Sequence, residues 1–270
     1  MTGNSFHGII RMYPIRMCPI FDESEAMQVA KDQRNGTTRE KIIETANRLF
    51  LDEGYTRTPM SRIAKELGIS TGNLTFHFPT KEHLLLELVK VMCRLQGEMT
   101  LGAARETDIS PLLAYALEIT LQTALCERSE IARDFYVSAY THPLTLTEIR
   151  TWDFHKASEL FGEYNPNWTE DDFRRTEDIA SGIEVAVLMT PCEDKITLDE
   201  KIACTLHNLM KIYNVPDTAS NRVIEQVLAI DYLTLSEVLL QQYRENLNCA
   251  EGDELALSYE NLLVREEGLA

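Results

Sequence analysis

The chain has 270 residues, 44% hydrophobic content and a formal net charge of −17. This length and apolar content exclude disorder of the whole chain, and no uncharged apolar run reaches the roughly 18 residues of a membrane span. The acidic balance argues against nucleic acid, whose phosphates attract cations. That exclusion does not cover residues 31–85, which hold nine Lys and Arg against seven Asp and Glu.

Residues 1–36 show no sustained hydrophobic period and lead into the polar run K-D-Q-R-N-G-T-T. This pattern is typical of a flexible extension. A start at the internal Met27 explains it equally well, and both interpretations stay open. Because Arg and Pro interrupt the first thirty residues, no secretory signal is expected, and we expect a cytoplasmic protein.

A strong helical pattern begins at Thr38 and stops at Gly54. Its apolar face comprises Ile42, Ile43, Ala46, Leu49 and Phe50. A second helix is predicted from Thr58 and Pro59, which read as an N-cap hydroxyl followed by proline at the first helical position, to a glycine stop at Gly68.

A third, short helix is predicted to follow at once. Ser70 reads as its N-cap, Leu74 and Phe78 as its apolar positions, and Pro79 ends it. A helix, a short glycine turn and a second short helix, braced by the helix before them, form the helix-turn-helix arrangement. In that arrangement the second helix enters the DNA major groove.

The next predicted helix begins after Thr80 and places Lys81 in its first turn. A cation at a helix N-terminus has the wrong sign and normally costs a few tenths of a kcal/mol. A negative group is therefore expected beside Lys81. The long apolar face of this helix should connect residues 37–85, the predicted DNA-binding domain, to the rest of the chain.

Residues 86–245 also show helical periodicity and no sustained strand alternation, so the fold class is predicted to be all-α. The periodic segments are Leu112–Leu125, Ile131–Tyr140, Leu146–Phe161, Phe173–Met189, Leu198–Tyr213 and Val223–Leu240. Residues 246–270 form an acidic tail. The six scattered cysteines have no C-x-x-C pair and no His at ligand spacing, so we expect reduced, mostly buried thiols and neither a metal nor a cofactor.

Residues 42–85 resemble the DNA-binding domain of the tetracycline-repressor (TetR) family of bacterial transcriptional regulators. The matching segments are A-N-R-L-F-L-D-E-G-Y-T-R-T (46–58), I-A-K-E-L-G-I-S-T-G-N-L (63–74) and H-F-P-T-K-E-H-L (77–84). The resemblance implies an all-α homodimer. Its small domain would bind double-stranded operator DNA, and its larger helical domain would dimerise and bind a small-molecule effector.

The expected DNA contacts are Thr58, Ser70, Thr71, Gly72, Asn73, Thr75, Phe76, His77 and Lys81. Short polar residues at the start of the recognition helix suit this role independently of the resemblance, since they and the free backbone N–H groups can reach phosphates or base edges. A phosphate would supply the negative group expected beside Lys81.

Three of these positions leave alternatives open. His77 either donates a hydrogen bond to a phosphate, as its counterpart in the family does, or caps the end of the recognition helix, where an imidazole is also favoured. Phe76, like Phe78, is interpreted as a packing residue rather than a base-stacking one. The family usually has tyrosine where Thr75 stands, so the backbone contact of that ring is in doubt, and the threonine methyl could instead meet a thymine methyl.

By analogy with the family, the segments Phe173–Met189 and Leu198–Tyr213 would form the dimer interface. Small residues in them would allow close approach of the helices, although they could equally pack inside a monomer: Ala180, Gly182, Ala186 and Ala203.

An effector pocket would be lined by aromatic and polar residues of the middle helices, although an aromatic stripe is more often plain core. The candidates are Tyr115, Phe135, Tyr136, Tyr140, Trp152 and His155.

The leading hypothesis is a dimeric repressor released from a palindromic operator by an inducer. The alternative is a regulator controlled by a protein partner. The many carboxylates after residue 85 also suggest a cationic ligand, although a solvated acidic surface explains them more simply. An enzyme is not expected, because the sequence has no G-x-S-x-G, Walker or H-E-x-x-H motif.

Overall fold

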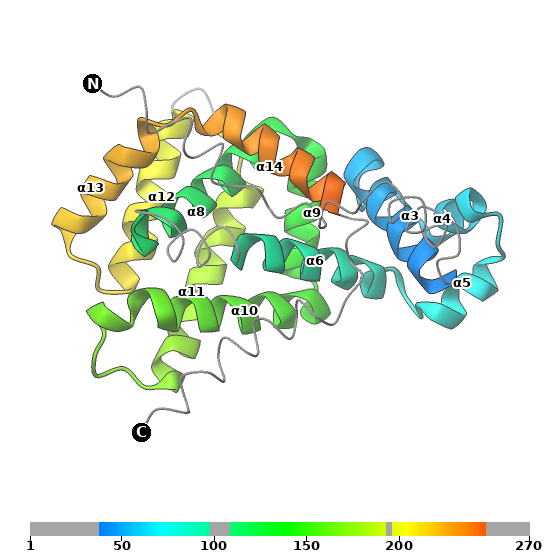
Figure 1. The fold of residues 1–270 in the computed structure, drawn as a ribbon, viewed down its shortest axis with the longest axis horizontal. Coiled ribbons are helices and arrows are strands. Elements are labelled where there is room, and N and C mark those ends of the chain that lie inside the picture. The colour runs from blue at the N-terminus through cyan, green and yellow to red at the C-terminus, as the bar shows by residue number, and fades with distance from the viewer. Residues whose placement is uncertain (1–37, 98–108, 193–195, 247–270) are drawn as a thin grey trace, which may run out of the picture.

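The computed structural model describes residues 38–97, 109–192 and 196–246, and every regular element in those ranges is a helix (Figure 1). The predicted all-α class is confirmed for this part of the chain. The predicted extension over residues 1–36 lies outside the described residues, as does the predicted tail beyond residue 246. No helix in the described ranges is both long and apolar enough to cross a membrane.

The N-terminal helices form a small head at one end of the molecule (Figure 1). They are α3 (Thr38–Glu53), α4 (Met60–Leu67) and α5 (Thr71–His77). α4 packs against both α3 and α5. Ile42, Ile63 and Leu74, one from each helix, are fully buried between them. The apolar positions read from the sequence are therefore the ones that hold this head together.

The turns of the head follow from its glycines and caps. Gly54 and Gly68 adopt left-handed φ angles of 94° and 67°, which side chains with a Cβ disfavour. The hydroxyl of Ser70 accepts the Asn73 N–H at 3.1 Å and begins α5 as predicted. The N-cap position of α4, however, is Pro59, and no side chain caps this helix, so the prediction that Thr58 caps it is wrong.

Replacing Gly68 with alanine tests the turn between α4 and α5. Apart from its two chain neighbours, no atom of the described residues lies within 4 Å of an added Cβ. The expected loss of about 1–2 kcal/mol in unfolding free energy therefore comes from the left-handed backbone. Urea denaturation measures it. A Gly72→Ala change in α5, where the backbone is helical, is the control, and an equal or greater loss there would contradict this account of Gly68.

α6 (Lys81–Gly97) leads from the head into the larger helical domain, where it packs along α10 (Pro143–Phe161). Together with α6 and α10, that domain contains α8 (Pro111–Arg128), α9 (Glu130–Thr141), the 3-10 turn η3 (Gly162–Tyr164), α11 (Glu170–Met189), α12 (Leu198–Ile212), α13 (Asp217–Leu228) and α14 (Tyr232–Asn246). α8 is buried along most of its length and packs against α9, α11, α12, α13 and α14. It is the central helix of the domain.

One helix prediction for this domain was wrong. The segment Val223–Leu240 is two helices, α13 and α14, separated by residues 229–231. The carboxylate of Asp231 accepts the Thr234 N–H at 3.1 Å at the start of α14. This local hydrogen bond favours a new helix start over a continuous helix.

Candidate nucleic-acid interface

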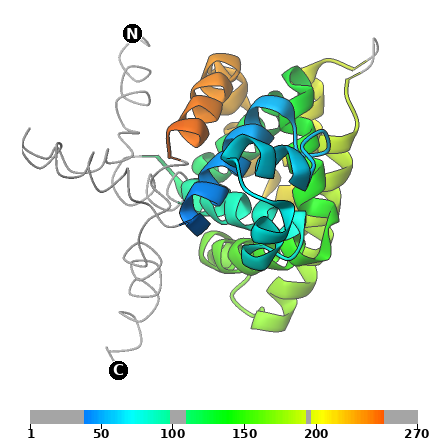
Figure 2. The same cartoon turned by 90° about the vertical axis from the view of Figure 1, so that its right-hand side faces the viewer.

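The exposed face of α5 is short and polar. Ser70, Thr71, Gly72, Asn73 and Thr75 are all exposed, whereas Leu74 between them is fully buried. The Ser70 hydroxyl and the Thr75 hydroxyl are engaged in local bonds, the latter donating to the Gly72 carbonyl at 3.1 Å. The structure therefore leaves these predicted contact residues exposed on α5, in the head that faces the viewer in Figure 2.

The two phenylalanines at the end of α5 differ in environment. Phe78 is buried, and the guanidinium of Arg39 lies 5.0 Å from its ring centre. Phe76 is 82% exposed, so its interpretation as a packing residue is wrong. Four-residue spacing places Leu74 and Phe78 on the inner side of the helix and turns Phe76 outward. The adjoining His77 is half-buried at the last position of α5, and its ring meets that of Phe76 edge to face.

Lys81 has a partner within the protein. Its ammonium donates to the Tyr55 carbonyl at 2.8 Å and lies 3.9 Å from the centre of the Tyr55 ring. Partial burial lowers the pKa of Lys81, whereas the charges of Glu82 and Asp134 raise it. The ring and carbonyl of Tyr55 thus offset the unfavourable position at the helix N-terminus. An ammonium has three N–H donors, so a bond to Tyr55 still leaves donors for a phosphate.

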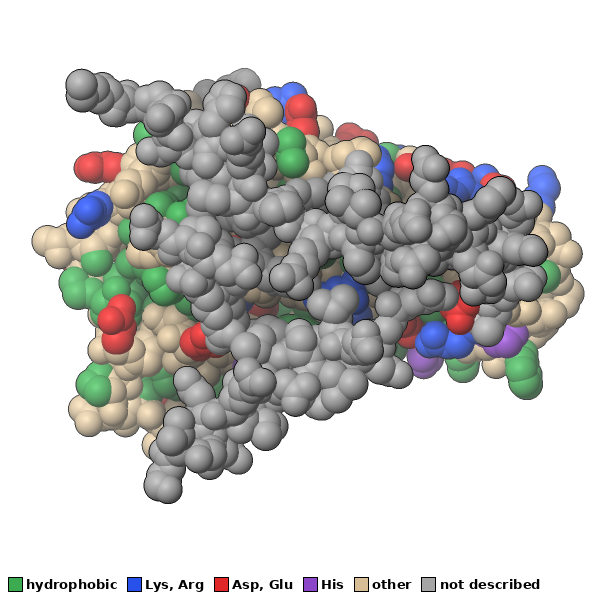
Figure 3. Space-filling model, in the orientation of Figure 1, with side chains coloured by type: hydrophobic (Ala, Val, Ile, Leu, Met, Phe, Trp, Pro, Cys, Tyr) green, Lys and Arg blue, Asp and Glu red, His purple; other side chains and the backbone are tan. Residues whose placement is uncertain are grey.

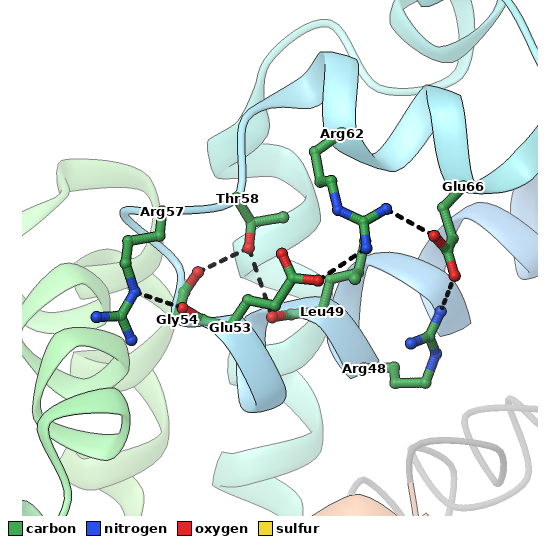
Figure 4. Close-up of polar contacts among 8 residues, drawn as sticks. All are labelled: Arg48, Leu49, Glu53, Gly54, Arg57, Thr58, Arg62 and Glu66. Atoms are coloured by element: carbon green, nitrogen blue, oxygen red, sulfur yellow. Dashed lines mark hydrogen bonds and ion pairs between the residues drawn. The ribbon is translucent and has the colours of Figure 1, made fainter.

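Thr58 lies inside the head and not on its surface. It is fully buried, and its hydroxyl donates to the Gly54 carbonyl at 2.7 Å and to the Leu49 carbonyl at 3.4 Å (Figure 4). Its side chain thus bonds the last turns of α3 and the residue that follows this helix. The prediction of a DNA contact by this side chain is therefore wrong.

An ion-pair network on the head was not found from the sequence. Arg62 donates to Glu53 at 2.8 Å and to Glu66 at 2.6 Å, and Arg48 donates to Glu66 at 2.9 Å (Figure 4). The network joins α3 to α4 and pairs both carboxylates with cations, which reduces their repulsion of a polyanion. At this end of the molecule basic, acidic and histidine side chains lie close together (Figure 3).

The predicted effector residues are mostly part of the core. Tyr115, Phe135, Tyr136 and Tyr140 are buried. Tyr115 packs edge to face on Phe161, and the Tyr136 and Tyr243 hydroxyls lie 3.3 Å apart. Trp152 and His155 are half-buried on α10. The interpretation of these aromatics as plain core is thus supported for the buried four, and a role in ligand binding stays a prediction.

The core of the helical domain contains charged groups that the sequence analysis did not identify. The ammonium of Lys156 lies 2.7 Å from Glu118 and 2.9 Å from Asp153. Tyr140 donates to Glu184 at 2.9 Å, and Tyr213 donates to Glu177 at 2.7 Å. We call Glu118, Asp153, Lys156, Glu177 and Glu184 the buried ionic cluster. Burial raises the pKa of both Glu177 and Glu184, the latter to about 8.

The family match lies in the head and the first turns of α6. Residues 42–88 match the family described as "Bacterial regulatory proteins, tetR family". The chain is 47% identical over 58 residues to the HTH-type transcriptional regulator LmrA of Bacillus subtilis, an alignment covering 21% of this chain and 31% of LmrA. It is 42% identical over 53 residues to the HTH-type transcriptional regulator QacR of Staphylococcus aureus, covering 20% of this chain and 28% of QacR. Each alignment thus spans less than a third of the relative's length.

Among solved structures, the crystal structure of RolR without ligand matches over 68% of this chain and 95% of RolR, with a TM-score of 0.51 and 15% identity. At that identity the match shows the fold alone. Fold and head together define an all-helical protein with an N-terminal helix-turn-helix domain. Residues 42–88 of this chain are the part that is similar to the TetR family of bacterial regulatory proteins.

Proposed function

We propose that the protein is a cytoplasmic transcriptional repressor that binds a palindromic operator as a homodimer and is released by a small-molecule inducer. The observation that carries the DNA-binding part is the exposed polar surface of α5, capped by Ser70, with Lys81 at the start of the next helix, α6. Side chains of this size at a helix N-terminus can reach base edges and phosphates in a major groove. Within this proposal Ser70, Thr71, Gly72, Asn73, Thr75, Phe76, His77 and Lys81 contact the duplex.

A dimer is proposed because the recognition surface of one head is small and weakly charged. Two heads about one DNA turn apart, roughly 34–36 Å, would read a palindrome together and multiply the affinity. α11 supports an interface, since Ile179, Gly182, Ala186 and Met189 are exposed at helical spacing along it. Ala180, in contrast, is buried within the single chain.

An inducer is proposed to act in the helical domain. The buried ionic cluster supports this part, because two of its carboxylates bond to aromatic side chains of the core. Glu184 accepts from Tyr140 and Glu177 accepts from Tyr213. A ligand releases DNA only if it binds the two conformations of the protein with different affinities. Control by a protein partner instead predicts DNA binding that no small molecule alters.

The proposed phosphate contact of Lys81 gives the test. Fluorescence anisotropy with a duplex selected by the wild-type protein should show binding about tenfold weaker for Lys81→Ala at 0.15 M salt. Each lost phosphate contact reduces the slope of log K against log salt by about 0.9, so a dimer should lose about 1.8. The weakening should be similar across duplex sequences, because phosphates carry no sequence information.

The matched control is Lys90→Ala, which removes the same charge from an exposed position farther along α6. We expect its salt slope to equal that of the wild type. Equal slopes for all three proteins would contradict a phosphate contact by Lys81.

A further inference from the structure

The C-terminal end of α3 and the turn that follows it are held by the helical domain. The carboxylate of Asp134, on α9, accepts the backbone N–H of Thr56 at 2.8 Å and also accepts the Thr56 hydroxyl. The approach is close enough that a Cβ added to Gly54 would lie 3.1 Å from the Asp134 carboxylate. Glycine at this position therefore permits both the left-handed turn and the close approach of the Asp134 carboxylate.

A second contact reaches the same end of α3 from a different helix. Arg244, on α14, donates to the Leu51 carbonyl at 3.2 Å and lies 3.6 Å from the Asp52 carboxylate. Carbonyls at a helix C-terminus carry partial negative charge, so a cation is favoured there. α9 thus contacts the turn after α3, and α14 contacts the end of α3, through side chains of opposite charge. We call these two residues, Asp134 and Arg244, the α3 latch.

Both latch helices are tied to the interior of the helical domain. The buried hydroxyls of Tyr136 and Tyr243, which lie 3.3 Å apart, join α9 to α14 close to the two latch residues. Farther along α9, Tyr140 donates to Glu184 of the buried ionic cluster. α9 therefore touches the cluster with one part and the head with another. A displacement of this helix would be transmitted to the turn at residues 54–57.

The latch lies behind the recognition surface. Thr56 belongs to the turn before α4, whereas the exposed polar face lies on α5. Asp134 is thus placed to orient the head without touching DNA. Contacts from two helices restrict the orientation of the head more than its covalent connection through α6 does. Each contact limits a rotation of the head that the other contact would allow.

We propose that Asp134, assisted by Arg244, is a positioning residue that sets the orientation of the head on the helical domain and so determines the spacing of operator half-sites that the dimer accepts. The inference rests on the proposed function, since it concerns how two heads meet one duplex. Its distinguishing consequence is a change in spacing preference rather than a general loss of affinity.

The test uses the full chain and three duplexes: the operator selected by the wild type, and the same operator with one base pair inserted or removed between its half-sites. One base pair moves a half-site by about 3.4 Å along the axis. The wild type should bind both altered duplexes at least tenfold more weakly than the selected one. We define the spacing ratio as the Kd for an altered duplex divided by the Kd for the selected one. In Asp134→Ala this ratio should fall to about a tenth of the wild-type value, because a charge-assisted pair of hydrogen bonds is lost.

Glu130→Ala is the matched control, because it removes a carboxylate from an exposed position on the same helix. It should keep the wild-type ratio. Thr56→Val keeps the backbone N–H but removes the hydroxyl donor, and should lower the ratio by an intermediate amount, while Thr56→Ser should restore it. Thr56→Val serves as the decisive variant if Asp134→Ala fails to fold.

An unchanged ratio in folded Asp134→Ala or Thr56→Val, with weaker binding to all duplexes alike, would overturn the inference, since a merely structural role predicts that result. A wild type that selects a palindrome but tolerates every spacing would also overturn it. A wild type that selects no duplex at all would instead overturn the proposed function and this inference with it.

Discussion

Replacing Lys156 with methionine is expected to lower the free energy of unfolding by about 3–5 kcal/mol. Lys156 is buried on α10 and is the cation that Glu118 and Asp153 share. Burial alone would lower the pKa of Lys156, but these carboxylates raise it well above its ordinary value. Methionine fills a similar volume without charge, and it leaves the buried carboxylates uncompensated.

Urea and thermal unfolding followed by circular dichroism would measure the loss. For a chain of this size it corresponds to a decrease of about 6–20 °C in Tm. Lys211→Met is the control, because Lys211 pairs with Asp217 at 3.0 Å on the exposed surface, and surface pairs contribute little. If both variants changed the unfolding midpoint equally, Lys156 would not be compensating buried charge.

The second large effect expected is a dependence of stability on pH that originates at Glu184. Burial, and then the charge of Asp153, raises the pKa of this carboxyl to about 8 from an ordinary value of 4.5, although Lys156 and the Tyr140 hydroxyl lower it. Between these two values the folded state binds more protons than the unfolded state. The free energy of unfolding must therefore fall as the pH rises through this window.

As the pH rises from 6 to 8, ionisation of Glu184 should lower the free energy of unfolding of the wild type by about 2 kcal/mol. Glu184→Gln cannot ionise, and its amide oxygen can still accept from Tyr140, so most of this loss should disappear in the variant. Urea denaturation at both pH values measures it. Glu225→Gln, at an exposed position on α13, is the control. A wild-type pH slope in Glu184→Gln would show that Glu184 is ionised throughout.

The head could be predicted from the sequence because its signals are local. Gly54 and Gly68 stop helices through their own backbone angles, and Ser70 caps α5 through a bond to a residue three positions away. The role of Thr58 could not be predicted, because a threonine before a proline has the same sequence pattern whether its hydroxyl caps the next helix or, as here, bonds the residue after the previous one.

The contacts of the site residues depend on partners distant in sequence. Lys81 meets Tyr55 and Asp134 meets Thr56 only because tertiary packing brings α6 and α9 to the turn after α3. No local pattern marks either pair. A negative group was expected beside Lys81. Within the protein a backbone carbonyl and an aromatic ring lie there, and the phosphate stays a prediction.

One residue of the buried ionic cluster, Glu118, could have been identified from the sequence. Glu118 is the sole charged residue between Pro111 and Glu127, in a segment otherwise apolar or weakly polar on every side. A helix that is apolar all round is buried, and its one carboxylate must then be buried and paired. Its partner Lys156 gave no such signal, because it lies on a helix with several other charged residues.

The central claim is that the exposed face of α5 reads operator DNA. Selection of duplexes from a random library by the purified full chain, followed by measurement of Kd on the selected and on shuffled sequences, tests it most directly. The account predicts a palindromic consensus and a Kd for the selected duplex about 10³-fold or more below that for shuffled DNA. Equal, salt-sensitive binding to both, or no enrichment of any sequence, would contradict it.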